Sequence, residues 1–146
     1  MSEPVQRAAR ATAVGAGTFG ARIVDLADRL ATHTETAGGL TCTYLSRAHR
    51  AVAKELQDLM QAAGLDAAID AVGNVTGRYR SANPAAQALI VGSHYDTVVD
   101  AGKFDGRLGI LLPIAVAAHL RHNGLFSSGS LPADRLRLHP KRASTP

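Results

Sequence analysis

Three residues near the middle of the chain could bind a divalent metal ion: His94, Asp96 and Asp105. His94 and Asp96 are two apart, and on an extended chain such residues point to the same side. One of them can bind a metal while the other holds the imidazole by a hydrogen bond, which fixes its tautomer and raises its basicity. Asp105 follows in a turn between Gly102 and Gly106, from which its carboxylate can reach back to the same point. Imidazole and carboxylate ligands together suit zinc, manganese or cobalt.

A strand is expected to position this candidate metal site. An apolar run at 88–91 leads directly into Gly-Ser-His-Tyr-Asp-Thr-Val at 92–98. Such a run is typical of a buried strand that ends in a cleft. In isolation, a His-x-Asp pair would most simply be two exposed surface residues. The preceding strand and the following glycine turn favour the interpretation as a metal site. We therefore predict that residues 88–92 form a central strand with His94, Asp96 and Asp105 at its C-terminal end.

Helices and a hairpin surround this strand in the predicted order. The periodicity predicts a helix from Phe19 to about Leu30 with Thr18 as its N-cap, and a second helix that Ser46 opens and Gly64 ends. Residues 65–71 and 74–79 are predicted strands joined at a Gly-Asn turn. The last predicted helix covers 107–122, contains Pro113, and is expected to face the sheet with Leu108, Leu111, Leu112, Ala115, Val116 and Leu120. This alternation predicts an α/β fold with three layers.

Composition excludes several classes of function. The net charge of +4 is concentrated at one end, because four of the 16 basic residues but only one of the 12 acidic residues follow position 124. No aromatic residues are interleaved with those charges, so no nucleic-acid partner is expected. No apolar stretch is long enough to cross a membrane. The single cysteine, Cys42, excludes an internal disulfide and fits a reducing compartment such as the cytoplasm. His119 and His122 could bind a metal at helical spacing, but an exposed or capping role is favoured for them.

Further stretches resemble one family in the same order along the chain. Gly-Leu-Thr at 39–41, Met-Gln-Ala-Ala-Gly-Leu at 60–65 and Asp-Ala-Val-Gly-Asn-Val-Thr-Gly-Arg at 70–78 precede His94, and Val-Asp-Ala-Gly-Lys-Phe-Asp-Gly at 99–106 follows it. From about residue 23 to about residue 123 the chain resembles the M20 family of metal-dependent amidohydrolases and peptidases. Within that family it is most similar to the branch of allantoate amidohydrolases and N-carbamoyl-L-amino-acid hydrolases. The residues at 99–106 resemble those of allantoate amidohydrolases more.

The resemblance implies a role for each residue of the candidate metal site. His94 would bind one of two divalent ions (zinc, manganese or cobalt), Asp105 would be the carboxylate that both ions share, and Asp96 would be a catalytic residue that orients His94. The implied fold is the three-layer α/β/α catalytic domain of a zinc hydrolase. The implied substrate is a small linear ureide or N-carbamoyl compound, with allantoate first, and intact members are homodimers. No substrate-binding residue can be identified.

Other parts of the family pattern are not visible in this chain. Members carry a Glu-Glu pair, which provides the general base and a metal ligand, then a dimerisation domain and two further histidine ligands. Residues 124–146 show no acidic pair and no recognisable strand, so no residue is available as the general base. We expect a loose N-terminus at 1–17, an incomplete catalytic domain at 18–123 and a disordered basic tail at 124–146.

The incomplete pattern leaves several interpretations open. The favoured one is a truncated or frame-shifted hydrolase that is inactive alone. The alternatives are a small hydrolase that borrows ligands from another chain, a non-catalytic binding or assembly protein built on half of an M20 domain, and an M20 amidase of the peptidase type.

Overall fold

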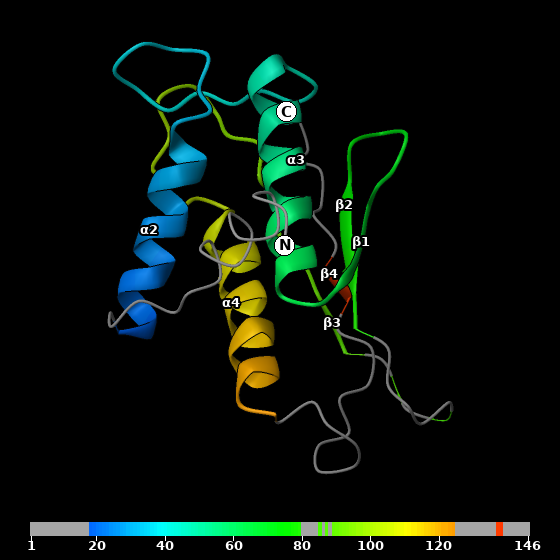
Figure 1. Ribbon diagram of the computed structural model, residues 1–146. Helices are drawn as coiled ribbons and strands as arrows, with labels where there is room; N and C mark the ends of the chain where they lie inside the picture. The colour runs from blue at the N-terminus through cyan, green and yellow to red at the C-terminus, as the bar shows by residue number, and fades with distance from the viewer. Residues whose placement is uncertain (1–17, 80–84, 86, 88, 125–136, 139–146) are drawn as a thin grey trace, which may run out of the picture.

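The computed structural model describes residues 18–79, 85, 87, 89–124 and 137–138. Their elements are α2 (Phe19–Ala31), α3 (Arg47–Ala62), β1 (Asp66–Ile69), β2 (Val75–Arg78), β3 (Ile90–Val91), α4 (Leu108–His122) and β4 (Arg137–Leu138). The strands form one mixed sheet in the order β1-β2-β4-β3 (Figure 1). β4 is antiparallel to β2 and parallel to β3.

Side-chain caps start the first two helices where the sequence predicts them. The hydroxyl oxygen of Thr18 accepts a hydrogen bond from the backbone N–H of Ala21, and that of Ser46 accepts one from His49. These bonds satisfy backbone donors that have no partner within the helix. Gly64 follows α3 with a φ of +86°, a conformation that ends a helix at little cost only for glycine. Both predicted helices are confirmed.

The predicted hairpin is also confirmed. β1 and β2 pair antiparallel from Asp66 opposite Arg78 to Ile69 opposite Val75. In the turn, the carboxylate of Asp70 accepts hydrogen bonds from the backbone N–H groups of Val72 and Asn74, which is how Asp commonly stabilises a turn.

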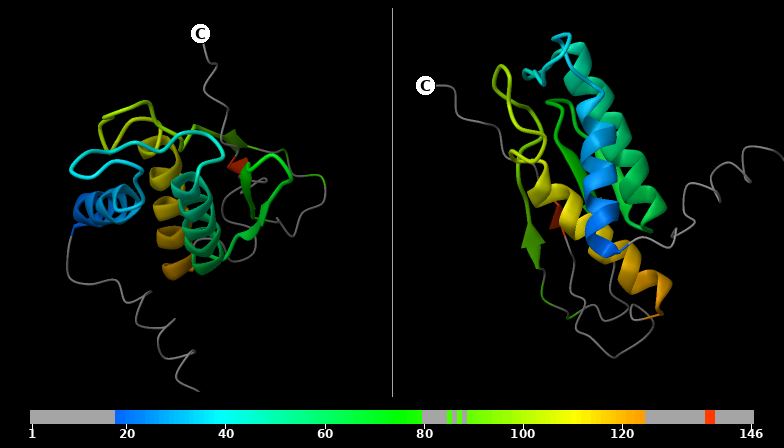
Figure 2. Two further views of the ribbon diagram at one scale, coloured as in Figure 1. Left: turned by 90° about the horizontal axis from the view of Figure 1, so that it is seen from above. Right: turned by 90° about the vertical axis from the view of Figure 1, so that its left-hand side faces the viewer.

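The helices gather on one side of the sheet (Figure 2). α3 packs on β1 and β2, whereas α4 contacts β3 on one side and α2 on another. Val52, Leu56 and Met60 repeat every four residues along α3 and are all inaccessible to solvent. The core that they form also includes Ala27, Leu30, Cys42, Leu65, Val75, Ile110, Leu111 and Ile114. The predicted α/β class is therefore correct, whereas the predicted third layer is not seen among the described residues, whose helices all lie on one side of the sheet.

The predicted strand at 88–92 differs from the observed one. β3 contains only Ile90 and Val91 and lies at the edge of the described sheet. Leu89 and Ile90 are 64% and 60% exposed, so the prediction of a buried central strand is wrong over the residues described; residue 88 lies outside them. A strand extends only as far as its partner, and β4 offers only Arg137 and Leu138 for pairing.

The expectation of no strand after residue 124 is wrong at β4. Two residues are too few to show any periodicity in sequence, and main-chain pairing does not require it. The other expectations for the tail concern 125–136 and 139–146, and the expected loose N-terminus concerns 1–17. These segments lie outside the described residues.

The predicted face of α4 is partly wrong. Leu111 and Ala115 are buried as expected, but Leu108, Leu112 and Val116 are exposed. Ile110, Ile114 and Ala117 are buried in their place. Since residues 108–118 are apolar almost all round the helix, their pattern has no polar face from which to infer orientation. None of the described helices combines the length and apolar character needed to cross a membrane.

Candidate metal site

His94, Asp96 and Asp105 lie close together at the C-terminal end of β3. The Nδ1 atom of His94 is 3.0 Å from the main-chain carbonyl oxygen of Asp96 and 3.4 Å from its Oδ1 atom. The Nε2 atom on the other side of the ring is 3.9 Å from Oδ1 of Asp105. The described structure thus brings together the three residues that the sequence singled out.

The surroundings of His94 determine its tautomer. A carbonyl oxygen can only accept a hydrogen bond, so the Nδ1 atom that faces it must carry the proton. In the neutral ring, Nε2 then presents its lone pair toward Asp105. A histidine that binds a metal through one nitrogen usually donates the other N–H to a carbonyl or carboxylate in this way. His94 thus has a hydrogen-bond pattern that is compatible with metal binding through Nε2, and its nearer partner is the backbone of Asp96 and not the carboxylate.

Gly106 and Gly109 allow the start of α4 to approach the segment that carries His94. A β-carbon at position 106 would lie 2.4–2.5 Å from three atoms of the His94 ring, and one at position 109 would lie 2.7 Å from Cβ of Ser93. The turn therefore places Asp105 opposite the imidazole because there is no side chain at 106 to separate them.

Arg107 anchors the same segment from inside the protein. Its side chain is fully buried. Its Nε donates to the carbonyl oxygen of Tyr95 at 3.2 Å, and its Nη1 donates to that of Leu30 at 2.9 Å. Tyr95 lies between His94 and Asp96, so Arg107 joins the site to the C-terminal end of α2. Burial lowers the pKa of Arg107, and the negative charge of Asp96 acts in the opposite direction.

A stack of rings supports the site segment on its other side. Tyr95 is buried and stacks on His49 with ring centres 4.4 Å apart, while its hydroxyl donates to the carbonyl of Gly73. Tyr44 meets His49 edge-on at 5.2 Å. Burial raises the pKa of the Tyr95 phenol, so this hydroxyl acts as a hydrogen-bond donor and not as an acid at neutral pH. Tyr95 is thus a structural support.

Hydrogen bonds hold the segment after Asp96 against the loop that contains Cys42. The N–H of Thr97 donates to the carbonyl of Cys42, and the N–H of Cys42 donates to the hydroxyl of Thr97, both at 2.8 Å. The N–H of Ala101 donates to Leu40. Burial raises the pKa of the Cys42 thiol, which suits a core residue and not a nucleophile.

The described donors fit part of a metal site. Within 18–79, 85, 87, 89–124 and 137–138, no group of three or more His, Cys, Asp or Glu side chains is arranged to hold a metal ion. His94 and Asp105 carry donor atoms of the kind that zinc or manganese takes, and the described residues add no third donor at that point.

Several supporting residues were not identified from the sequence. The sequence predicts only that Arg107 begins a helix, because a basic residue next to a glycine turn carries no sign of burial. His49 was hidden among the charged residues of α3. Gly106 was visible as a turn glycine, but its contact with the His94 ring could not be inferred.

Comparisons with known proteins give relatives over most of the chain. No protein-family model matches it. It is 41% identical over 101 residues to allantoate deiminase 1 of Glycine max, an alignment that covers 69% of this chain and 21% of that protein. It is 35% identical over 93 residues to the N-carbamoyl-L-amino acid amidohydrolase of Geobacillus stearothermophilus, covering 64% of this chain and 23% of that enzyme.

A solved structure agrees with these sequence relatives. The fold is similar to that of a hydantoinase/carbamoylase family amidase from Burkholderia ambifaria, with a TM-score of 0.72 and 28% identity over 83% of this chain and 29% of the other. The chain thus spans about a fifth of the length of the curated relatives it matches.

Proposed function

The chain belongs, over the part that aligns, to the amidohydrolase family of allantoate deiminases and N-carbamoyl-L-amino-acid amidohydrolases, and on that premise we propose that it contributes half of a metal-dependent active site. The reaction would be hydrolysis of a C–N bond in a linear ureido or carbamoyl compound. The observation that carries the proposal is the orientation of His94, whose Nδ1 is held by Asp96 and whose Nε2 faces Asp105.

We assign roles to the three residues on that geometry. His94 and Asp105 would be ligands, and Asp96 would orient His94 through its carbonyl oxygen at 3.0 Å, with its carboxylate near the same nitrogen. A divalent ion bound there, which could be zinc, manganese or cobalt, would polarise a carbonyl group and lower the pKa of a water molecule. The proton transfers that hydrolysis requires need a general base, for which we propose no residue of this chain.

The substrate class follows from the names of the relatives. Allantoate deiminases and N-carbamoyl-L-amino-acid amidohydrolases both act on a ureido group. The higher identity to the deiminases places allantoate first in the proposal and N-carbamoyl amino acids second. The free, buried thiol of Cys42 supports a reducing compartment such as the cytoplasm.

Metal titration tests the assignment of ligands. Calorimetry with Zn²⁺ or Mn²⁺ should give an affinity that falls in His94→Ala and Asp105→Asn. His119→Ala and Asp25→Asn are matched controls, because both residues are exposed and lie on other parts of the surface. The His119 control also measures any binding by the pair His119 and His122. Equal losses in His94→Ala and His119→Ala would contradict the proposed site.

One observation favours a second candidate, a non-catalytic binding or assembly protein. No group of three or more possible ligand side chains comes together among the described residues, whereas a catalytic zinc site has three ligands from the protein. If Zn²⁺ and Mn²⁺ do not bind to His94 and Asp105 at any practical concentration, this second function replaces the first.

A further inference from the structure

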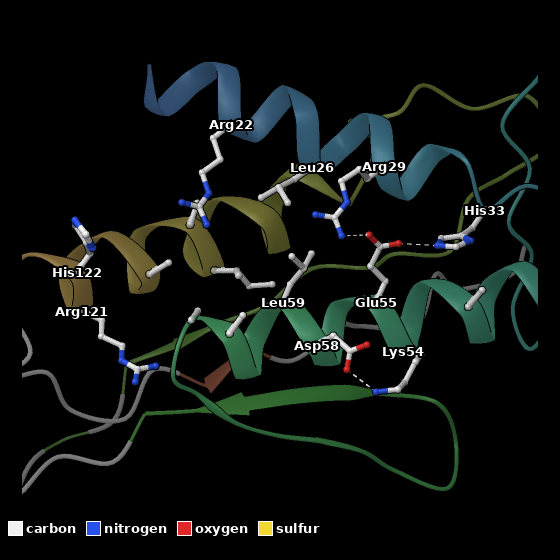
Figure 3. Close-up of a pocket in the computed structure, with 16 residues that line it drawn as sticks. Arg22, Leu26, Arg29, His33, Lys54, Glu55, Asp58, Leu59, Arg121 and His122 are labelled. Carbon is white, nitrogen blue, oxygen red and sulfur yellow. Dashed lines mark hydrogen bonds and ion pairs between the residues drawn. The ribbon is translucent and has the colours of Figure 1, made fainter. Parts of the chain in front are cut away.

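A cavity of about 810 Å³ lies between α2, α3 and α4, and none of the candidate metal-site residues lines it (Figure 3). Its volume falls in the range of sites that bind small molecules. Its floor is apolar and is formed by Leu26, Leu59, Ile114, Ala115 and Ala118 from the three helices. A ligand with an apolar body could therefore lie along it.

The charged residues around this cavity do not balance. Its two acids are both engaged: Glu55 pairs with Arg29 at 2.7 Å and with His33 at 2.6 Å, and Asp58 pairs with Lys54. Arg22 and Arg121 also line the cavity. Neither has an acidic partner among the residues that the structure describes. Among the described residues, the lining of the cavity therefore carries two more positively than negatively charged side chains.

These two arginines lie toward one end of the cavity, together with His122, whereas the Arg29–Glu55–His33 group lies toward the other (Figure 3). Arg121 is exposed, and its guanidinium lies against Gly64, next to the C-terminal end of α3. One end of the cavity is thus positively charged, and paired charges stand at the opposite end.

Arg22 gives the strongest indication of a ligand. It lies in the first turn of α2, a turn that contains no acidic residue, and its side chain is half-buried. The N-terminal end of a helix carries a partial positive charge, so a cation there is unfavourable and an anion is favoured. A half-buried guanidinium at this position, with no acidic partner among the described residues, is the arrangement that a bound anion would stabilise.

We propose that this cavity binds an amphiphilic anion. Its carboxylate, or a similar singly charged group, would bind Arg22, and its apolar chain would pack on the apolar floor of the cavity. Arg121 adds to the field at the head. The paired charges at the opposite end limit the length of the apolar body, which favours a small molecule over an amphipathic helix of a partner protein.

Calorimetry on the full 146-residue chain with decanoate tests this proposal. Decanoate should bind with one-to-one stoichiometry, and two probes should bind much more weakly: decyltrimethylammonium, which has the same body and the opposite charge, and butyrate, which has the same head and little body. Arg22→Gln should weaken decanoate binding about tenfold, the effect of about 1.4 kcal/mol from one lost charged contact. Arg22→Lys should retain most of the affinity, and Ala118→Leu should reduce it by filling the floor.

Arg50→Gln is the matched control. Arg50 is an exposed arginine of α3 that does not line the cavity, so its loss should leave binding unchanged. Circular dichroism should show that each variant is folded. Three results would overturn the proposal: no saturable binding of decanoate, equal binding of the cationic probe, or equal losses in Arg22→Gln and Arg50→Gln. Binding of an acidic amphipathic peptide without binding of decanoate would do the same.

Discussion

Gly106 lies directly against the imidazole of His94, because a β-carbon at position 106 would be 2.4 Å from the ring atom Cε1. Gly106 also has a φ of +65°, which is the left-handed region that glycine adopts without strain. The turn after Asp105 thus packs its backbone on the ring of His94. This contact leaves Nε2 of the ring 3.9 Å from the Asp105 carboxylate.

Replacement of Gly106 by alanine should therefore damage the candidate site more than the fold. The left-handed backbone costs an alanine about 1 kcal/mol of unfolding free energy. The methyl group must also displace the His94 ring, so metal affinity should fall by about 10- to 100-fold, as when ligand orientation is lost. Urea denaturation and Zn²⁺ titration measure the two effects.

Gly102→Ala is the control for this variant. Gly102 belongs to the same glycine-flanked turn, has no positive φ, and has open space around it. A loss of metal affinity in Gly102→Ala as large as that in Gly106→Ala would show that the turn as a whole, and not contact with His94, is responsible.

The residue types of the candidate site could be predicted, but their support could not. His94, Asp96 and Asp105 are chemically distinctive, and their spacing in a strand-and-turn context indicates ligands. The sequence did not reveal that the backbone of Asp96 lies nearer to His94 than its carboxylate, since a main-chain contact has no residue signature. Arg107 is fully buried, whereas arginine is almost always exposed, so its residue type alone would have predicted the opposite of what the structure shows.

Arg107→Met should destabilise the protein by about 2–3 kcal/mol. The variant keeps an apolar chain of similar length but removes the Arg107 donors from the buried carbonyl oxygens of Tyr95 and Leu30, of which Leu30 keeps the backbone N–H of His33. Arg47→Met, at an exposed position of α3, should change stability by no more than about 0.5 kcal/mol. Similar denaturation midpoints for the two variants would contradict the anchoring role of Arg107.

Stability should fall on the acid side because of His49. Burial lowers its pKa, Arg50 and Arg107 act in the same direction, and Asp96 opposes them. The ordinary pKa of histidine is about 6.5, so below that pH the unfolded chain binds a proton that the folded chain does not. The free energy of unfolding should therefore decrease as the pH falls from 6.5 toward the folded pKa.

His49→Phe tests this pH dependence. The variant keeps a ring between Tyr44 and Tyr95 and removes Nδ1, a buried atom that has no hydrogen-bond partner among the described residues. The difference in unfolding free energy between about pH 7.5 and pH 5.5 should become smaller in His49→Phe than in the parent. The exposed His119→Phe should leave that difference unchanged, and an effect of equal size there would exclude His49 as the cause.

Features of the fold that depend on neighbouring residues were predicted better than features that depend on residues distant in the sequence. The caps Thr18 and Ser46 and the Gly-Asn turn each act within a few residues, so they could be read directly. The position of β3 at the sheet edge depends on its pairing with β4, more than 40 residues later in the chain. The face of α4 depends on α2 and β3 in the same way, and an almost wholly apolar helix gives no pattern from which to predict it.

The 146-residue chain should bind metal weakly and show no measurable hydrolysis. In the proposed site His94 and Asp105 would be two ligands, and the described residues provide no third. Titration with Zn²⁺ or Mn²⁺ should show low affinity, and incubation with allantoate or an N-carbamoyl amino acid should release no ammonia. Turnover that persists through purification and is lost in Asp105→Ala, but not in the exposed Asp25→Ala, would contradict this prediction and favour a self-sufficient hydrolase.

The chain should also self-associate through the edge that β3 presents. Within the described sheet β3 pairs only with β4, and Leu89 and Ile90 beside its free edge are largely exposed. An exposed apolar edge strand readily pairs with another chain. Sedimentation should show species larger than a monomer, and Ile90→Lys should shift the distribution toward monomer. Val24→Lys, which adds the same charge at an exposed apolar position of α2, should not. A monomer at all concentrations, or equal effects of the two lysines, would show that association does not use β3.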